Sequence, residues 1–335
     1  MVITLLSSYF AVYLEQLRSQ NVRTQGFRFA QSTRKNYISH VRTWFFFSCY
    51  FDIPSLPAAE EHLCLFMELM SNTAGYEHCK NILGGVKYLH GALGLPFPSN
   101  SFSLDTTMQG LKRRLARTPF QVLPVNPTVL KLMYRGINVD KKEDLALWSS
   151  FLVAFYCLFR KANVVPENSK SDFSKVLTRE NVEIDEINRK VYIYVGFSKT
   201  NQYRKYDRCI PIPENDDPCL DLFRHIKRLF SIVHAPPNAP AFSYTSRSFI
   251  NYKVFTTRMK KLLGLAGLNP DFYSGHSFRR GGASFLFSVG ASQLMVQVLG
   301  NWSSMVYTRY LYLSEEDRLE AQSLMKDAIN STIST

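Results

Sequence analysis

The sequence lacks the patterns that mark secreted, disulfide-stapled and membrane-spanning proteins. Its six cysteines form no disulfide-framework pattern, which favours a reducing, intracellular compartment. The first residues carry neither the basic segment nor the cleavage-site pattern of a signal peptide. The longest apolar stretch, residues 145–159, is shorter than the roughly 20 residues that cross a bilayer. We therefore expect this stretch to be a buried helix and the protein to have no membrane partner.

Patterns for bound metals and nucleotides are missing as well. The histidines and cysteines between residues 62 and 79 lack the paired spacing of a zinc site. The aspartates between residues 216 and 221 are flanked by prolines, and we interpret them as turn residues. The sequence also has no glycine-rich loop that could cradle the phosphates of a nucleotide. It therefore predicts neither a metal nor a cofactor.

Positive charge is what the sequence has in excess. Lysine and arginine total 40 against 27 acidic residues, which gives a formal net charge of +13 and a pI near 9.4. The excess is spread along the chain, with 12 basic against 7 acidic residues in 1–118 and 28 against 20 in 119–335. Two basic domains suit a clamp around a polyanion better than one basic tail would. Charge alone does not identify the polyanion.

Helical periodicity runs through residues 1–118. Ser32 and Thr33 are candidate caps of an early helix, helices are expected at 58–70 and 76–93, and Asp105 is a candidate cap of the last helix. Prolines follow this last helix, so we place a linker at residues 119–126. The remaining residues, 127–335, form the second predicted domain.

The second domain mixes helices with a short strand region. A helix is expected after Pro127, and the buried helix of residues 145–159 is expected to end at Arg160. Residues 182–212 change to strand-like alternation, typical of a small antiparallel sheet with a hairpin tip at 198–201. Helical spacing returns from Leu220 onward. The predicted fold class is mostly α with a small antiparallel β-sheet (α+β).

One ordered set of residues suggests chemistry. His276 and Arg279 are three residues apart, so a helix would place them on one face, where they can converge on an anion. Trp302 and Tyr310 follow at short range, and Arg160 lies upstream with Lys199. Taken alone, each of these residues is more simply explained by a structural role. Together they are the groups needed to attack a phosphodiester with a tyrosine.

At these positions the sequence resembles the tyrosine recombinase (phage integrase) family. The likeness is greatest to its eukaryotic mobile-element branch, the Crypton, Ngaro and DIRS-type recombinases. It is carried by residues 158–163 (LFRKAN), 197–201 (FSKTN), 275–283 (GHSFRRGGA) and 299–304 (LGNWSS), followed by Tyr310. It extends over about the whole chain, and it is specific as an ordered set rather than for any single member.

The resemblance implies a role for each residue of the set. Arg160 and Arg279 would grip the scissile phosphate, because planar guanidinium forks suit the charge of a phosphorane. Lys199 would protonate the departing 5′ oxygen, and His276 would contact the phosphate and help to accept the proton of the nucleophile. Trp302 can bond a phosphate oxygen but cannot carry a proton. The competing interpretations are structural: Arg160 could cap a helix, Lys199 could be an exposed lysine at a hairpin tip, and Trp302 could be a core residue.

The nucleophile has two main candidates. Relatives in the mobile-element branch place it eight residues after the tryptophan, which selects Tyr310. Tyr307 then lies one helical turn earlier and is interpreted as a packing residue. Tyr312 is a distant third candidate. One departure from the family is Asn163, where many relatives carry an acidic residue that is thought to support the site.

Several basic residues are expected to contact the DNA backbone. They are Arg34, Lys35, Lys112, Arg113, Arg114, Arg117 and Arg280. For the run at 112–117, a solvated helix face is the competing interpretation. No specific role can be assigned to Arg280 from its position next to Arg279.

The resemblance gives the overall expectation for function. Residues 1–118 would be a helical core-binding (SAM-like) domain and residues 127–335 a catalytic domain ending in a helix, which docks either on a neighbouring protomer or on its own domain. The protein would be a nuclear DNA strand transferase that needs no metal or ATP, free as a monomer or dimer and tetrameric in a synapse on double-stranded DNA. The alternatives are a type IB topoisomerase, a host-adopted DNA-binding protein with a vestigial site, and a basic scaffold.

Overall fold

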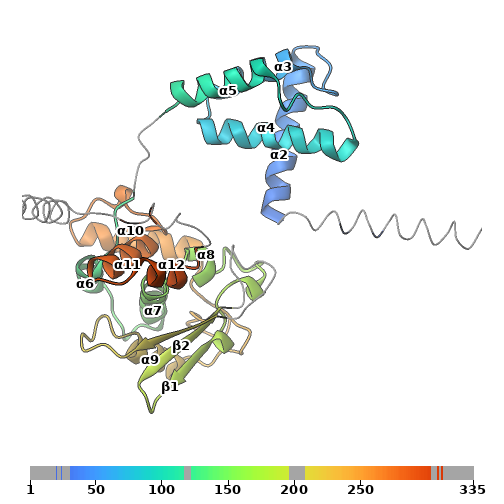
Figure 1. The fold of residues 1–335 in the computed structure, drawn as a ribbon. Coiled ribbons are helices and arrows are strands. Elements are labelled where there is room, and N and C mark those ends of the chain that lie inside the picture. The colour runs from blue at the N-terminus through green and yellow to red at the C-terminus, as the bar shows by residue number, and fades with distance from the viewer. Residues whose placement is uncertain are drawn as a thin grey trace, which may run out of the picture. The chain divides into compact units, whose positions relative to one another are not determined.

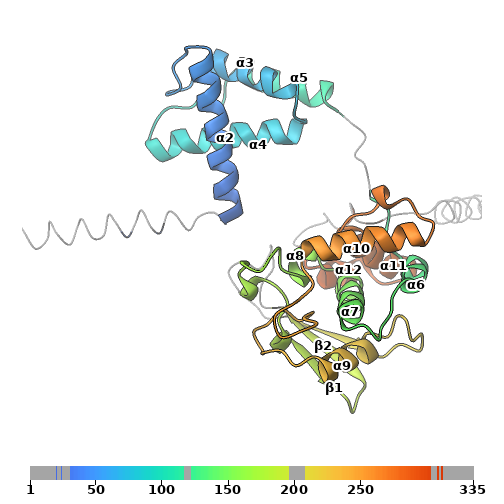
Figure 2. The same ribbon diagram turned by 180° about the vertical axis from the view of Figure 1, so that it is seen from behind.

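The structure is a computed structural model, and it describes residues 20, 24, 31–116, 122–195, 208–302, 308 and 311. The chain divides into two compact units, Met1–Pro119 (unit 1) and Phe120–Thr335 (unit 2), drawn in Figures 1 and 2. Each unit has its own hydrophobic core. Among the described helices, none is both long and apolar enough to cross a bilayer.

The described part of unit 1 is helical. It contains α2 (Gln31–Tyr50), α3 (Glu60–Ser71), α4 (Tyr76–Leu93) and α5 (Phe102–Arg114). Helix α2 packs on α4, and α3 packs on α5. Their facing sides bury large apolar residues, among them Trp44, Phe47, Leu63, Phe66, Met67, Ile82 and Val86. The predicted helical character of this region is confirmed wherever the structure describes it.

Two predicted helix caps in unit 1 are wrong. Ser32 and Thr33 are the second and third residues of α2 as described, so neither is the capping residue that precedes a helix. Helix α5 begins after Ser101, whose hydroxyl accepts the Leu104 N–H at 3.1 Å. Asp105 lies instead in the first turn, where its charge still suits the positive end of the helix. Serine satisfies the free N–H groups of the first turn as well as aspartate does, so the pattern alone could not separate the two caps.

Unit 2 is built around α7 (Lys142–Tyr156), which is buried along most of its length. The preceding helix, α6 (Pro127–Tyr134), has its proline at the first turn as predicted. The prediction that the buried helix continues to Arg160 is wrong. Leu158 has a left-handed φ of 52°, which turns the chain out of α7, and Arg160 adopts an extended conformation before the short helix α8 (Lys161–Val164).

The predicted antiparallel sheet is confirmed. Strands β1 (Val182–Asp185), β2 (Lys190–Val195) and β3 (Arg208–Pro213) pair in the order β1-β2-β3, with Val182 opposite Ile193. The inward residues Val191, Ile193, Ile210 and Ile212 are buried in the main core. The sheet therefore forms one face of unit 2, and the predicted hairpin tip at 198–201 lies outside the described residues.

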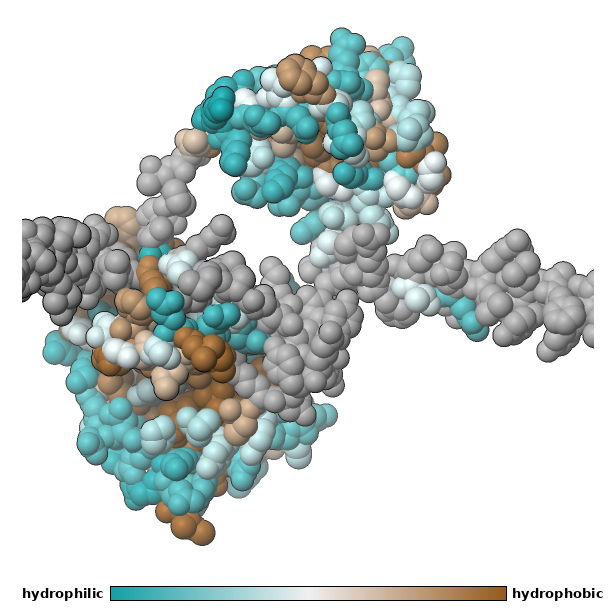
Figure 3. Space-filling view, in the orientation of Figure 1, coloured by the Kyte–Doolittle hydropathy of each residue, from teal (hydrophilic) through white to brown (hydrophobic). Residues whose placement is uncertain are grey.

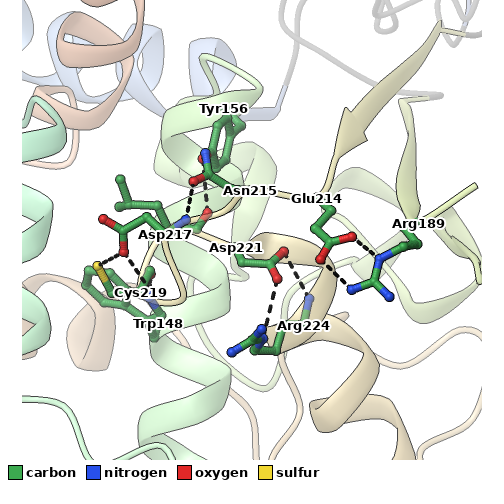
Figure 4. A network of polar contacts seen from close by, with 10 residues as sticks. Trp148, Tyr156, Arg189, Glu214, Asn215, Asp217, Cys219, Asp221 and Arg224 are labelled. Atoms are coloured by element: carbon green, nitrogen blue, oxygen red, sulfur yellow. Dashed lines mark hydrogen bonds and ion pairs between the residues drawn. The ribbon is translucent and has the colours of Figure 1, made fainter.

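Polar contacts hold the loop between β3 and the next helix, α9 (Leu222–Ile232), as Figure 4 shows. The Asp217 carboxylate accepts the Cys219 N–H at 3.0 Å, and the Asp221 carboxylate caps α9 by accepting the N–H of Arg224 at 3.2 Å. The Trp148 indole on α7 donates to the Cys219 carbonyl at 2.7 Å. The bond to Cys219 agrees with the interpretation of Asp217 as a turn residue, whereas Asp221 is a helix cap.

Three further helices complete the described part of unit 2: α10 (Tyr252–Leu265), α11 (Ser277–Ser288) and α12 (Gln293–Gly300). Helix α11 packs on α7 and on α12. Short 3₁₀ turns lie at Phe173–Lys175, Arg179–Asn181 and Pro270–Phe272. The predicted C-terminal helix at residues 314–335 lies outside the described residues.

Candidate active site

Two adjacent glycines seat the start of α11 against the neighbouring backbone. A Cβ at Gly281 would lie 1.9 Å from the Val125 carbonyl oxygen, and a Cβ at Gly282 would lie 2.4 Å from the Phe155 carbonyl oxygen. Real Cβ contacts are never this short, so any side chain here would push α11 away from α7. The Gly-Gly step therefore fixes the position of the preceding residues, which include Arg279.

Arg279, on α11, is buried, with only 3% of its surface exposed. Its Nη1 donates to the Leu158 carbonyl at 2.5 Å, and its Nη2 donates to the Gly300 carbonyl at 2.8 Å. The guanidinium carbon also lies 3.9 Å from the centre of the Trp302 ring, a favourable cation–π distance. Arg279 thus joins the chain after α7 to the end of α12.

Trp302 reaches Arg279 through a backbone reversal after α12. Asn301 has a left-handed φ of 53°, and the Trp302 N–H donates to the Gln297 carbonyl at 3.0 Å. The ring then lies against Gly300, where a Cβ would come within 1.6 Å of the indole. The side chain is 7% exposed and belongs to a small apolar cluster. Trp302 therefore belongs to a hydrophobic cluster and also contacts Arg279.

Arg160 and Lys161 lie close to the segment that leads into α11. Arg160 is half-buried and precedes α8, which begins with Lys161. The Lys161 ammonium lies 4.7 Å from the centre of the Tyr252 ring. A Cβ at Gly275 would lie 2.8 Å from the Lys161 side chain, so the segment that begins with Gly275 runs close beside α8. This packing brings residues 160–161 next to residues 275–276.

His276 lies among these cations. It precedes α11, and its side chain is exposed. Desolvation by the surrounding protein lowers the pKa of His276, and the positive charges of Arg160, Arg279 and Lys161 lower it further. An imidazole with a lowered pKa is neutral at pH 7 and can accept a proton. Arg160, Lys161 and Arg279 are thus close enough to His276 to act on its charge, and this excess of positive charge favours an anion there.

The structure brings together four of the six predicted chemical residues: Arg160, His276, Arg279 and Trp302. Lys199 and Tyr310, and the rival tyrosines Tyr307 and Tyr312, lie outside the described residues. Lys161 was not among the residues predicted from the sequence, and its position next to Arg160 was the available signal.

The residues expected to contact DNA have different environments. Arg34, Lys35, Lys112 and Arg113 are exposed, as a backbone contact requires. Arg114 is also exposed, but it pairs with the Glu68 carboxylate, which neutralises part of its charge. Arg117 lies outside the described residues.

Arg280 differs from these surface residues. Its side chain is 5% exposed and donates to the Leu311 carbonyl at 3.3 Å. The contact of Arg280 with DNA stays a prediction.

Nothing in the described part of the chain groups three or more histidine, cysteine or acidic side chains in a way that could hold a metal ion. Asn163, at the position where relatives carry an acid, contributes its backbone: its N–H donates to the Arg160 carbonyl at 2.8 Å, and its carbonyl accepts the Leu177 N–H at 3.0 Å. Asn163 therefore ties α8 to the segment before β1 through main-chain bonds, which do not depend on the type of side chain.

An apolar area lies on the surface of unit 2 over α12, where Figure 3 shows brown side chains. Leu294, Met295 and Val298 on α12 are each more than 60% exposed, and Val289 before it is 61% exposed. Exposed apolar residues that cluster in this way commonly mark a surface that binds another protein segment.

Comparison with solved structures identifies the fold. XerH site-specific recombinase bound to a difH substrate is 13% identical, with a TM-score of 0.55 over 80% of this chain and 70% of that one. The Tn1549 transposon integrase in complex with circular intermediate DNA is 13% identical, with a TM-score of 0.56 over 92% and 98%. A lambda integrase dimer bound to a core site is 15% identical, with a TM-score of 0.55 over 90% and 94%. The chain has the fold of these recombinases and integrases.

Comparisons of sequence add nothing to this assignment. A scan against models of protein families gave no match, and a search of curated proteins gave none. The similarity is thus visible in the three-dimensional arrangement and not in overall sequence identity.

The lowered pKa of His276 leads to a prediction for the free protein. In an NMR titration, the imidazole of His276 should have a pKa below the ordinary histidine value of about 6.5. Replacing Lys161 with alanine should raise this pKa, because one of the repelling charges is removed. His225, whose pKa is lowered mainly by burial, is the internal control and should not change. If the Lys161 substitution left the pKa of His276 unchanged, the convergence of charges would be contradicted.

Proposed function

We propose that this protein is a DNA strand transferase that cleaves and rejoins DNA through a 3′-phosphotyrosine intermediate. The observation that carries the proposal is the packing of Gly275 against Lys161, which places Arg160 and Lys161 next to His276, three residues before Arg279. A site with three permanent cations and a proton acceptor suits a phosphodiester that gains charge in its transition state. The likeness in fold to DNA-bound recombinases and integrases supports the same assignment.

The proposed reaction needs no external source of energy. The phenol oxygen of Tyr310 attacks the phosphorus atom, the bond from phosphorus to the 5′ oxygen breaks, and the phenol proton passes to His276. Lys199 gives a proton to the departing 5′ oxygen. A 5′ hydroxyl of another strand then attacks the phosphotyrosine and releases the tyrosine. One phosphodiester is replaced by another, so ATP is not required.

The arginines act on the charge of the phosphate. Arg160 is half-buried beside His276, and the Arg279 guanidinium is already oriented by its carbonyl partners and Trp302. Groups held in place before the reaction stabilise a transition state without reorganisation at the moment of attack. Gly281 and Gly282 contribute by holding α11 against α7.

The finer assignment to the eukaryotic mobile-element branch belongs to this proposal, and with it a nuclear location. It is supported by the motif at residues 275–283 and by the spacing between Trp302 and Tyr310. We also propose that unit 1 is the core-binding domain and that four protomers meet on DNA. The exposed apolar residues of α12 support such contacts, and a lambda integrase tetramer bound to a Holliday junction has the same fold.

The direct test is formation of a covalent adduct. A nick a few nucleotides from the cleavage site traps the intermediate. Cleavage then releases a short fragment that carries the new 5′ hydroxyl, and once this fragment has diffused away the attack cannot be reversed. A protein–DNA adduct that resists denaturation should form in the presence of EDTA. Binding without any adduct would favour a DNA-binding protein with a vestigial site. Relaxation of supercoiled DNA by monomers, without exchange of strands, would favour a topoisomerase.

The role of Lys199 can be tested through the leaving group. Lys199→Ala should slow cleavage of ordinary DNA, because the 5′ oxygen then leaves without a proton. A substrate with sulfur in place of the bridging 5′ oxygen should restore the rate, since a thiolate leaves readily without protonation. Arg279→Ala is the control and should not be rescued by sulfur. Failure of sulfur to rescue Lys199→Ala would remove Lys199 as the general acid.

A further inference from the structure

Two consecutive arginines on α11 hold different parts of unit 2. Arg279 donates to the carbonyls of Leu158 and Gly300 and stacks on Trp302. The next residue, Arg280, emerges about 100° further around the helix. Its Nη2 donates to the Leu311 carbonyl at 3.3 Å. Arg280 thus ties α11 to Leu311.

Leu311 is attached to unit 2 by its main chain and its side chain. Its N–H donates to the Thr308 carbonyl at 3.3 Å, and its carbonyl accepts the bond from Arg280. Its partly buried side chain packs on a cluster that contains Leu158 and Trp302. Leu311 directly follows Tyr310 in the sequence.

Arg280 is 5% exposed and Arg279 is 3% exposed, so burial alone does not separate the two arginines. What distinguishes Arg280 is its bond to the Leu311 carbonyl. Removing a permanent charge from water is unfavourable unless polar partners replace the water. An apolar side chain could fill the same space without that cost. The Leu311 carbonyl is such a polar partner for the charge of Arg280.

We propose, on the basis of the function proposed above, that Arg280 is a positioning residue that holds Leu311 within its own subunit and so limits how Tyr310, the residue before it in the sequence, approaches the phosphate. Consecutive Cα atoms are about 3.8 Å apart, so a fixed Leu311 restricts the backbone of the residue before it. Displacing a reacting group by about 1 Å can slow a reaction about 100-fold. Arg280 therefore acts on the rate of attack without touching DNA.

This arrangement also explains why the two arginines are adjacent. Arg279 belongs to the cluster proposed to bind phosphate, and Arg280 holds the segment proposed to carry the nucleophile. Both side chains start from the same turn of α11, which Gly281 and Gly282 seat against fixed backbone. The distance between the phosphate and the attacking oxygen is then set by one rigid element.

The test compares Arg280→Met and Arg280→Lys with a matched control, Arg179→Met. Arg179 is likewise buried at 8% exposure and donates to a main-chain carbonyl, that of Ser243 at 3.1 Å, but that carbonyl lies outside the proposed site. Both methionine variants remove a buried guanidinium from unit 2. Any effect that follows from lost stability alone should therefore appear in both.

The first readout needs no activity. Amide hydrogen exchange should become faster in a peptide covering residues 308–311 in Arg280→Met, less so in Arg280→Lys, and should not change there in Arg179→Met. The second readout is the rate of adduct formation on nicked DNA at saturating protein. Arg280→Met should lower it about 10- to 100-fold with its Kd for DNA within threefold of the wild type, and lysine should restore part of the rate.

Three results would overturn the inference. Wild-type exchange at residues 308–311 in Arg280→Met would show that the contact does not hold the segment. An equal loss of rate in Arg179→Met would assign the effect to stability. A loss of DNA affinity that accounts for the loss of rate would make Arg280 a DNA contact. If the wild-type protein forms no adduct, the proposed function fails, while the exchange measurement still decides whether Arg280 holds the segment.

Discussion

Replacing Tyr310 with phenylalanine is expected to abolish the covalent adduct with nicked DNA. The substitution removes only the phenol oxygen, which is the atom that would bond to phosphorus, so no phosphotyrosine can form. Affinity for DNA should change little, since one hydroxyl contributes about 1 kcal/mol at most to binding a long polyanion. Adduct formation is measured on denaturing gels and affinity by titration of labelled DNA.

Tyr307→Phe is the matched control for this prediction. It removes the same atom three residues earlier and should leave adduct formation intact, because Tyr307 is interpreted as a packing residue. If Tyr307→Phe lost the adduct and Tyr310→Phe kept it, the two assignments would be exchanged. If both variants kept it, Tyr312 would become the candidate nucleophile.

Replacing Arg160 with alanine is expected to slow cleavage by about 10²- to 10³-fold, comparable to the loss of one oxyanion-hole donor. Arg160 is half-buried beside His276, and its charge contributes to the lowered pKa of that histidine. Its removal takes away a permanent cation at the place where the phosphate would gain charge. The rate of adduct formation should be measured in single turnover at saturating protein, so that weaker binding does not contribute.

Lys170→Ala is a suitable control for the Arg160 substitution. Lys170 is an exposed cation ten residues further along the chain, and nothing in the described structure links it to His276. The control should retain the wild-type rate at saturating protein. Equal loss in both variants would mean that net charge, not the site, controls cleavage. Dependence of the remaining activity on a divalent metal would contradict the proposed mechanism.

Local patterns predicted the regular elements of the fold well. The helix at 76–93 and the three strands follow from apolar spacing with periods of 3.6 and 2, which depends on neighbouring residues only. The end of α7 was predicted three residues too late. Leu158 and Phe159 are buried apolar residues that continue the pattern, yet Leu158 turns the chain with a left-handed φ. A buried residue need not be helical, and apolar residues in a sequence indicate burial only.

The sequence by itself determined which chemical groups this protein carries and in what order. The spacing from His276 to Arg279, the presence of Trp302 and Tyr310 after them, and the excess of positive charge were sufficient to predict a site for an anion. Only the tertiary structure decided which cation does what. Arg279 and Arg280 are the same amino acid, but one joins α7 to α12 and the other holds Leu311. Lys161 enters the cluster because Gly275 packs against it. Such roles depend on contacts between residues that are far apart in the chain, and no local pattern contains them.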